Sequence, residues 1–374
     1  MTLPDVPTRG RSVRSTITSD GQVRLSLEER PLPELGDGQV LVAVEASPIN
    51  PSDLGVLLGP VRPDGLARDG DDLVGSVPAE LLPRVRDRLD KSLPVGNEGA
   101  GTVVAGVPEL VGKRVALFGG SMWADYRVAD AGAVVELPND VSTAEGAALF
   151  VNPLTALAMV ETMRAENHTA LVHTAAASNL GQMLVKICAD DGVPLVNIVR
   201  RPEQVELLKG IGAEHVIDSS QPDFAEQLTE AIRATGATLA FDAVGGGTLA
   251  GQILSAMERA QPPLASYTPY GSTTYKQVYI YGSLDFSPTV IDRDFGLTWG
   301  LGGFLLMVAL GRLGGETFAR MRARVVTEAK TTFASSFAET IGLSEVLDLQ
   351  KLGVFARRST GTKYLVDPSS DRAA

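Results

Sequence analysis

The chain predicts an α/β protein in which a doubly wound parallel sheet is joined to a body of short strands. From Ser142 onward, apolar β-prone runs alternate with segments of helical periodicity, the pattern of a parallel sheet covered by helices. Before that, residues 12–50 and 95–137 alternate apolar and polar positions around Pro, Gly and Asp, which indicates a small all-β barrel. At 374 residues the chain is long enough for two domains, each with a core.

The most informative segment is 169–201, TALVHTAAASNLGQMLVKICADDGVPLVNIVRR, which predicts strand, turn, helix and strand. Such a unit places backbone N–H groups and a helix N-terminus beside a pyrophosphate. Laid over G-x-G-x-x-G, the turn has Ala176, Ser178 and Gly181, so it retains the third glycine alone. Small residues at the other two positions still let a phosphate approach. The alternative is an ordinary crossover that binds no nucleotide.

Two arginines end the second strand of this unit. In NAD-binding chains an acidic residue about twenty positions past the last turn glycine binds the ribose 2′-hydroxyl. Arg200 and Arg201 stand at about that distance from Gly181. Guanidinium groups suit a 2′-phosphate, so we expect the cofactor to be NADPH.

The rest of the chain continues the alternation and contains two unusual stretches. Further strands are expected at 214–220, 238–245, 263–271 and 278–284. The charged, turn-rich stretch 60–94 is too irregular for a core element, and we expect an excursion over the surface or the active site. The apolar stretch 295–311 contains five glycines and is slightly short for a membrane span, so a buried or subunit-interface helix is expected.

Composition excludes several classes of function. A net charge of -12 argues against a nucleic-acid partner, while a cofactor phosphate needs only a local basic spot. The single cysteine, Cys188, excludes internal disulfides and fits a buried structural thiol in a reducing compartment. The N-terminus lacks the apolar core of a signal peptide. We therefore expect a cytoplasmic protein with a small-molecule substrate and no nucleic-acid or membrane partner.

Short motifs spread over nearly the whole chain, apart from 60–94, carry a family resemblance: INPSD, VGNEG, VNPLTA, AAASNLGQ, NIVRRPE, GAEHVID, AVGG and GTKYL. In this order they resemble the medium-chain dehydrogenase/reductase superfamily, and within it the zinc-free quinone oxidoreductases and 2-enoyl thioester reductases. The resemblance implies a GroES-like β-barrel catalytic domain at 1–152, with 60–94 as an insertion. It also implies a Rossmann NADPH-binding domain at 153–294, a return to the catalytic domain at 295–374, and a homodimer.

The resemblance also implies that no metal is bound. In zinc-dependent relatives three ligand positions correspond to Asn50, Asn97 and about Val151 of this chain. All three are lost together, and one Cys with three His leaves little else for zinc. Hydride transfer without zinc needs hydrogen bonds or a proton donor to handle the charge on the substrate oxygen.

The cofactor site implied by the resemblance is distributed over both expected domains. Its residues are Asn50, Asn152, Thr155, Ala177, Ser178, Asn179, Leu180, Arg200, Arg201, Tyr270, Gly271, Ser272, Thr273, Phe295, Gly296, Leu297 and Lys363. Tyr270–Thr273 match the loop after the fifth strand, and 295–297 match the segment that passes the nicotinamide. Three of these residues have structural alternatives: Asn152 as a helix cap, Tyr270 in turn packing and Lys363 as a solvated edge charge.

The chain departs from the family in its catalytic residues. Enoyl thioester reductases carry a proton-donating tyrosine shortly after the INPSD motif, and the matching position here is about Val61. Ser52 matches a hydroxyl of the proton relay in zinc enzymes, and it could equally be a turn serine. Tyr267, Tyr275 and Tyr279 are other candidate donors, or packing residues.

The expected function is zinc-independent, NADPH-dependent reduction of a quinone or an α,β-unsaturated carbonyl compound. An electron-poor quinone needs no dedicated protein acid, which fits the missing tyrosine. The alternatives are an enoyl-thioester reductase of CoA or carrier-protein substrates with a different proton donor, and an NADPH-binding protein without turnover.

Overall fold

A computed structural model describes residues 6–263, 268–357, 361 and 363–373 of the chain. It divides into two compact units, the first formed by 1–151 and 328–374 and the second by 152–327. The first boundary lies one residue from the expected one. The expected return at 295 is wrong, because the segment 299–303 adds a strand to the sheet of the second unit.

The first unit is built from two sheets of short strands. One has the order β4-β5-β2-β1-β6, and the other has the order β10-β8-β7-β3-β18-β17 with β9 also paired to β3. The bounds of the first sheet are β1 Arg9–Ile17, β2 Gln22–Pro31, β4 Leu66–Asp69, β5 Asp72–Ser76 and β6 Leu93–Pro94. Those of the second are β3 Gln39–Pro48, β7 Glu98–Gly106, β8 Arg114–Phe118, β9 Tyr126–Asp130, β10 Val135–Glu136, β17 Glu339–Ile341 and β18 Tyr364–Val366.

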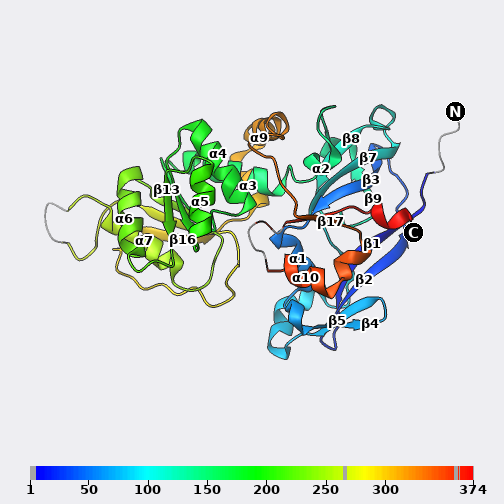
Figure 1. The fold of residues 1–374 in the computed structure, drawn as a ribbon, viewed down its shortest axis with the longest axis horizontal. Helices are drawn as coiled ribbons and strands as arrows, with labels where there is room; N and C mark the ends of the chain where they lie inside the picture. The colour runs from blue at the N-terminus through cyan, green and yellow to red at the C-terminus, as the bar shows by residue number, and fades with distance from the viewer. Residues whose placement is uncertain (1–5, 264–267, 358–360, 362, 374) are drawn as a thin grey trace. The chain divides into compact units, whose positions relative to one another are not determined.

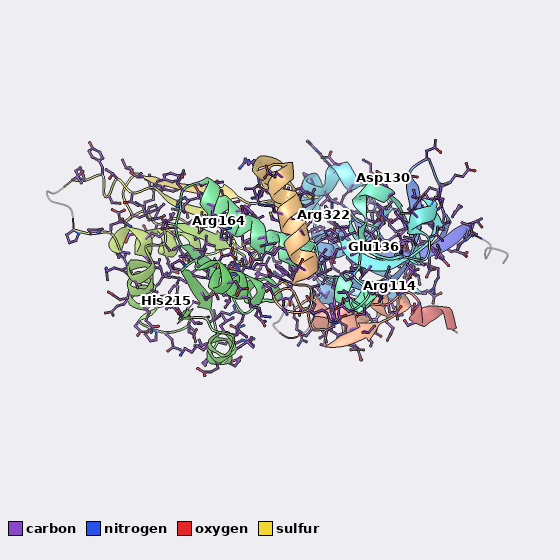
Figure 2. All side chains as sticks on the ribbon, turned by 90° about the horizontal axis from the view of Figure 1, so that it is seen from above. Arg114, Asp130, Glu136, Arg164, His215 and Arg322 are labelled. Atoms are coloured by element: carbon purple, nitrogen blue, oxygen red, sulfur yellow. The ribbon has the colours of Figure 1, made fainter. Side chains whose placement is uncertain are left out.

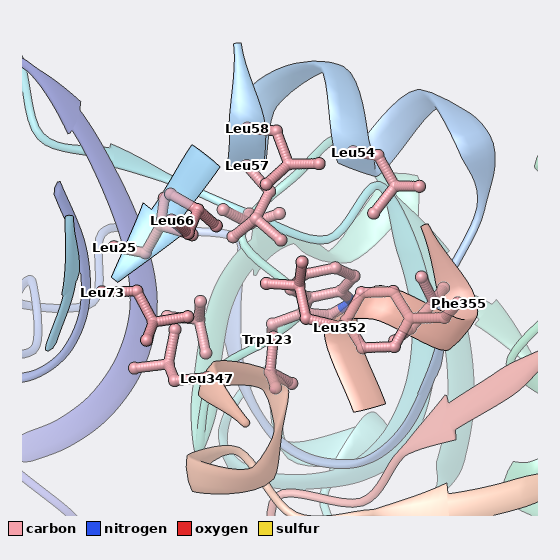
Figure 3. Close-up of a cluster of buried hydrophobic side chains, with 14 of the residues drawn as sticks. Leu25, Leu54, Leu57, Leu58, Leu66, Leu73, Trp123, Leu347, Leu352 and Phe355 are labelled. Atoms are coloured by element: carbon pink, nitrogen blue, oxygen red, sulfur yellow. The ribbon is translucent and has the colours of Figure 1, made fainter. Parts of the chain in front are cut away.

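Three α-helices accompany these sheets: α1 Pro51–Leu58, α2 Thr143–Gly146 and α10 Leu349–Phe355. The core that joins α1 to the returning C-terminal segment surrounds Trp123, which is fully buried, and includes Leu57, Leu352 and Phe355 (Figure 3). Pairing of β18 with β3 brings residue 363 close in the fold to the segment that begins at residue 49.

The stretch 60–94 is more regular than expected. Within it, β4 and β5 form an antiparallel pair, and β5 pairs with β2 to extend the first sheet. Leu73 is fully buried and Leu66 is 8% exposed, so the hairpin contributes to the core. The amphipathic part becomes the 3₁₀ segment η2, Ala79–Arg88. The prediction of a stretch too irregular for the core is therefore wrong.

The second unit confirms the doubly wound parallel sheet. Its order is β13-β12-β11-β14-β15-β16, with every pair parallel. In Figure 1, α6 and α7 lie on one side of this sheet and α4 and α5 on the other. The strands are β11 Leu171–Thr174, β12 Leu195–Val199, β13 His215–Asp218, β14 Leu239–Asp242, β15 Lys276–Ile280 and β16 Trp299–Gly303. The helices are α3 Val151–Ala165, α4 Asn179–Asp191, α5 Pro202–Gly210, α6 Phe224–Thr235, α7 Leu249–Arg259, α8 Leu306–Leu313 and α9 Gly315–Thr327.

Two local predictions in this unit were wrong. The described part of 263–271 is loop and turn, with 264–267 outside the described residues, and the fifth strand is β15. The stretch 295–311 is not one helix but β16 followed by the start of α8. Asp191, the last residue of α4, links two other helices: it accepts from Arg164 of α3 (Figure 2) and from Arg324 of α9.

None of the helices in the described ranges is long and apolar enough to cross a membrane.

Candidate functional site

The turn after β11 has the geometry of a phosphate-binding turn. The Ser178 hydroxyl caps α4 by accepting a hydrogen bond from the Gly181 backbone N–H at 3.2 Å. A Cβ on Gly181 would lie 2.1 Å from the Ala176 carbonyl oxygen, so only glycine allows this close approach of helix and turn. The turn begins at Ala175, whose φ of 49° is in the left-handed region. Ala177, Asn179 and Leu180 lie in this turn and the first turn of α4, where helix N–H groups can receive an anion.

Arg200 and Arg201 lie at the carboxyl end of β12, the strand that pairs with β11. Both are exposed. The Arg201 Nε lies 3.0 Å from a carboxylate oxygen of Glu203, and the Arg200 backbone N–H donates to the Gln204 side chain. Both residues therefore stand at the sheet edge that carries the turn, as their spacing from Gly181 predicted. That they bind the 2′-phosphate stays a prediction.

A buried network connects the carboxyl ends of β11 and β14, where the strand order reverses and open α/β sheets bind ligands. The Asp242 carboxylate accepts hydrogen bonds from the Thr174 hydroxyl at 2.7 Å and from the Val244 and Gly245 backbone N–H groups. It is fully buried. The AVGG motif therefore begins directly at this edge.

Seven of the expected cofactor residues lie at the other edge of the sheet. Tyr270–Thr273 precede β15 rather than follow it, and 295–297 precede β16. The two segments meet through the Leu297 N–H, which donates to the Tyr270 carbonyl. Because both strands are parallel to β11, these segments belong to the amino edge, opposite the Ser178 turn. Placing Tyr270, Gly271, Ser272, Thr273, Phe295, Gly296 and Leu297 in the cofactor site is therefore wrong.

Several residues at this amino edge have contacts within the fold. The Ser272 N–H and hydroxyl both donate to Glu258, which also pairs with the fully buried Lys276. Phe295 is fully buried and packs edge-on against Trp299. Tyr270 is 65% exposed.

The residues that do follow the fifth strand are Tyr281, Gly282 and Ser283. The Tyr281 hydroxyl lies 2.7 Å from Nε2 of His173, and the two rings stack. Burial lowers the pKa of His173 to about 3, so the imidazole is neutral at physiological pH. The local sequence pattern does not predict this pair, although the apolar run that ends at Tyr281 indicates the strand.

A polar cluster in the first unit surrounds the positions that correspond to zinc ligands in relatives. The Asn50 amide donates to the Glu98 carboxylate at 2.7 Å. Glu98, which is fully buried, also accepts the backbone N–H groups of Phe150 and Val151. Burial raises the pKa of the Glu98 carboxyl. Amide and valine side chains do not suit Zn²⁺, and no group of three His, Cys, Asp or Glu in the described ranges could hold a metal ion.

Asp53 and Lys363 complete this cluster. Asp53 accepts the backbone N–H groups of Asn50 and Asn97, and burial raises its pKa to about 7. The Lys363 ammonium nitrogen is buried and makes no hydrogen bond within the part of the chain that the structure describes. Burial lowers the Lys363 pKa, while Glu98 and Asp53 oppose that change. A solvated edge charge is therefore the wrong description of Lys363.

The other candidates lie in simpler surroundings. Ser52 is exposed in the first turn of α1, and its hydroxyl accepts a hydrogen bond from the Asn97 amide at 2.9 Å. Asn152 and Thr155 lie in the first turns of α3. Val61 is 7% exposed and belongs to the core of the first unit.

The candidate tyrosine donors have hydrogen-bond partners of their own. The Tyr275 hydroxyl donates to Gln277, and that of Tyr279 donates to Glu166. Tyr267 lies outside the described residues.

Comparison with known proteins relates the chain to oxidoreductases. A family model described as "Zinc-binding dehydrogenase" matches residues 180–260, from α4 to α7. The mitochondrial enoyl-[acyl-carrier-protein] reductase of Caenorhabditis elegans is 30% identical over 249 residues, which cover 63% of this chain and 64% of that protein. The human enzyme of the same name is 29% identical over 58% of this chain and 54% of its own length. The match thus spans less than two thirds of these relatives.

Solved structures match over almost the whole length. A protein of Mesorhizobium loti, described as an NADPH:quinone reductase, is 27% identical with a TM-score of 0.72, over 98% of this chain and 100% of that one. A mycobacterial protein solved in complex with NADPH is 19% identical with a TM-score of 0.66, over 96% of this chain and 100% of that one, and shows the fold alone. These matches confirm the fold class, a Rossmann sheet plus a GroES-like barrel. Together these matches support the medium-chain dehydrogenase/reductase superfamily, and within it the zinc-free quinone and enoyl reductases, as the proteins that the chain is similar to.

Proposed function

We propose that the protein is an NADPH-dependent reductase that transfers hydride to a quinone or an α,β-unsaturated carbonyl compound. The observation that carries the proposal is the position of Arg200 and Arg201 at the carboxyl end of β12, beside the Ser178-capped turn. A phosphate on the turn and a second phosphate on the arginines match the two anionic parts of NADPH. The Mesorhizobium loti protein described as an NADPH:quinone reductase supports the same cofactor.

NADPH, when bound, supplies the hydride. The residues of the chain then bind and orient the cofactor. The N–H groups of the first turn of α4 face the pyrophosphate, and the two arginines select the 2′-phosphate. Core packing of Val61, at the position of the family's donor tyrosine, supports an acceptor that needs no protein acid there. Quinones meet this requirement, because the reduced form takes its proton from solvent.

The second candidate function is reduction of an enoyl thioester, and the relatives named enoyl-[acyl-carrier-protein] reductase favour it. It requires another proton donor. Ser52 is a candidate because its exposed hydroxyl accepts the Asn97 amide hydrogen bond, which leaves the hydroxyl proton available.

The cofactor proposal is tested by replacing Arg200 and Arg201 with alanine together. Affinity for NADPH is expected to fall about 10- to 100-fold, because each arginine can make charge-assisted hydrogen bonds to the 2′-phosphate, while NADH binding stays nearly unchanged. Titration calorimetry with both nucleotides measures this. The matched control is Arg293→Gln, an exposed arginine elsewhere in the second unit. Equal losses for both nucleotides would sink the specificity argument.

The acceptor is tested by NADPH oxidation against quinones, enones and enoyl-CoA. Turnover with quinones that survives Ser52→Ala supports the first proposal. Turnover with enoyl-CoA that Ser52→Ala abolishes supports the second. Tight NADPH binding without oxidation by any acceptor favours the third possibility, a binding protein without turnover.

The oligomeric state and the partners of the protein are also part of the proposal. We propose a homodimer with a small-molecule substrate and no nucleic-acid or membrane partner. The net charge of -12 supports the exclusion of nucleic acid. A cytoplasmic location stays a prediction.

A further inference from the structure

A cavity of about 470 Å³ opens in the second unit, between the end of α3, the carboxyl ends of β15 and β16, and α8. Its size falls within the roughly 300–1,000 Å³ of small-molecule sites. Aromatic side chains form one wall, those of Tyr279, Tyr281 and Phe304, and aliphatic side chains of α8 form another. None of the residues proposed to hold the pyrophosphate or the 2′-phosphate lines this space.

The aromatic wall is held in place before any ligand arrives. The Tyr279 hydroxyl donates to Glu166 at 2.8 Å, and the Tyr281 hydroxyl lies 2.7 Å from the buried His173. Phe304 packs edge-on against Phe241, with ring centroids 5.0 Å apart. A rigid aromatic wall lowers the entropic cost of binding a planar molecule, and aromatic rings favour stacked or edge-on partners.

One charge on the cavity lining has no partner. Arg312, on α8, forms no ion pair or side-chain hydrogen bond within the described ranges. The other charged group of the lining, Glu166, already accepts the Tyr279 hydroxyl. A guanidinium beside an apolar wall is suited to a carboxylate, sulfonate or phosphate attached to an apolar body.

We propose that this cavity binds a small aromatic molecule that carries one acidic group, with its ring against Tyr279, Tyr281 and Phe304 and its acid at Arg312. The site goes beyond the proposed hydride transfer and does not depend on it. Binding therefore occurs without nucleotide.

The test uses two fluorescent probes that differ in charge, anilinonaphthalene sulfonate and the uncharged N-phenyl-naphthylamine, each titrated into the full chain without cofactor. Ala309 is 7% exposed and lines the cavity, so Ala309→Trp fills it. This variant is expected to weaken the binding of both probes at least tenfold. Arg312→Gln is expected to lower the affinity for the sulfonate about fivefold, because it removes one exposed charge, and to leave the affinity for the uncharged probe unchanged. The control, Arg293→Gln, changes neither.

The two variants separate the parts of the proposal. If Ala309→Trp binds both probes as the original chain does, the cavity is not their site and the proposal is overturned. If Arg312→Gln weakens neither probe, or both equally, the acidic group is not recognised there and the ligand class is wrong. Arg312→Gln lies on the surface and does not disturb the core, so its result stands even where Ala309→Trp fails to fold. Nucleotide affinity stays unchanged in Arg312→Gln, which separates this proposal from the cofactor proposal.

Discussion

At the scale of single residues, some hydrogen bonds of the candidate site join neighbours in the sequence, and others join side chains far apart in it. Ser178 and Gly181 are three positions apart, and one turn brings them together. Asn50 and Glu98 are 48 positions apart, and His173 and Tyr281 are 108 apart. Such pairs depend on sheet register and strand order, which the local pattern of a single sequence does not contain.

Asp53 leads to a prediction about pH and stability. Its pKa is raised from 3.8 to about 7, so between these values the folded chain holds a proton that the unfolded chain releases. The contribution of Asp53 to the free energy of unfolding should therefore fall as pH rises from about 4 to 7, by on the order of a few kcal/mol, and level off above that. Glu98, whose pKa is also raised, acts with the same sign as Asp53. His173, whose pKa is lowered to about 3, acts with the opposite sign, so the Asp53 contribution is measured by denaturant unfolding as the difference in slope between the original chain and a variant without this carboxyl.

Asp53→Asn is the variant for this prediction. Both carboxylate oxygens of Asp53 accept backbone N–H groups, and an amide offers one acceptor oxygen, so stability at pH 5 should fall by about 1–3 kcal/mol. The slope of the free energy of unfolding between pH 4 and 7 should become more positive, because the downward contribution of Asp53 is removed. Asp64→Asn, an exposed aspartate of the same unit, serves as the control. An unchanged slope in Asp53→Asn would show that Asp53 does not titrate in this window.

At the scale of elements, regular alternation of apolar and polar residues predicted strands well. Strands in segments rich in charge or glycine were not predicted. Each strand of the β4–β5 hairpin buries one residue, Leu66 in β4 and Leu73 in β5. The exposed Arg68 and Asp69 therefore gave the segment the composition of a loop. In β16, a Cβ on Gly300 would lie 2.2 Å from the Gln277 side-chain oxygen, so a larger residue there would displace the Gln277 amide. Periodicity cannot distinguish such a strand from a glycine-containing helix.

The element with the strictest steric requirement is the turn between β11 and α4. Gly181→Ala should destabilise the second unit by about 1–3 kcal/mol or more, because its Cβ would clash with the backbone of Ala176. Opening the turn should also weaken nucleotide binding. Gly210→Ala is the matched control, because a Cβ at this last position of α5 meets nothing within 4 Å. Thermal unfolding and nucleotide titration of both variants measure the effect, and equal stability of the two would contradict the proposed packing.

At the scale of the whole molecule, the sequence predicted the order of the two units. It did not predict the residue at which the chain returns to the first unit. The helix α9 carries the chain from the sheet of the second unit to 328, where the first unit resumes. The expected boundary at 295 came from the family resemblance, and the strand β16 was not expected because 295–311 was predicted to be one helix. The observed boundary assigns three further elements to the second unit, β16, α8 and α9, and β16 gives it an apolar sheet edge.

That edge supports the proposed homodimer. Within the described residues β16 pairs with β15 alone, so its outer backbone groups are open to another strand. Leu301 is 36% exposed on this strand, and Met307 is 54% exposed at the start of α8. Unpaired edges with apolar side chains favour association with a second copy.

Leu301→Lys combined with Met307→Glu should therefore convert the dimer into a monomer, because charges on an edge strand oppose strand addition. Light scattering after size-exclusion chromatography should show the molar mass fall from twice the chain mass to that of one chain. Neither residue lines the cavity beside α8, so probe binding there should persist in the monomer. Leu207→Lys, at a position on α5 that is 37% exposed, is the control for adding charge to an apolar surface position. A doubly substituted protein that keeps twice the chain mass would place the dimer contact away from β16.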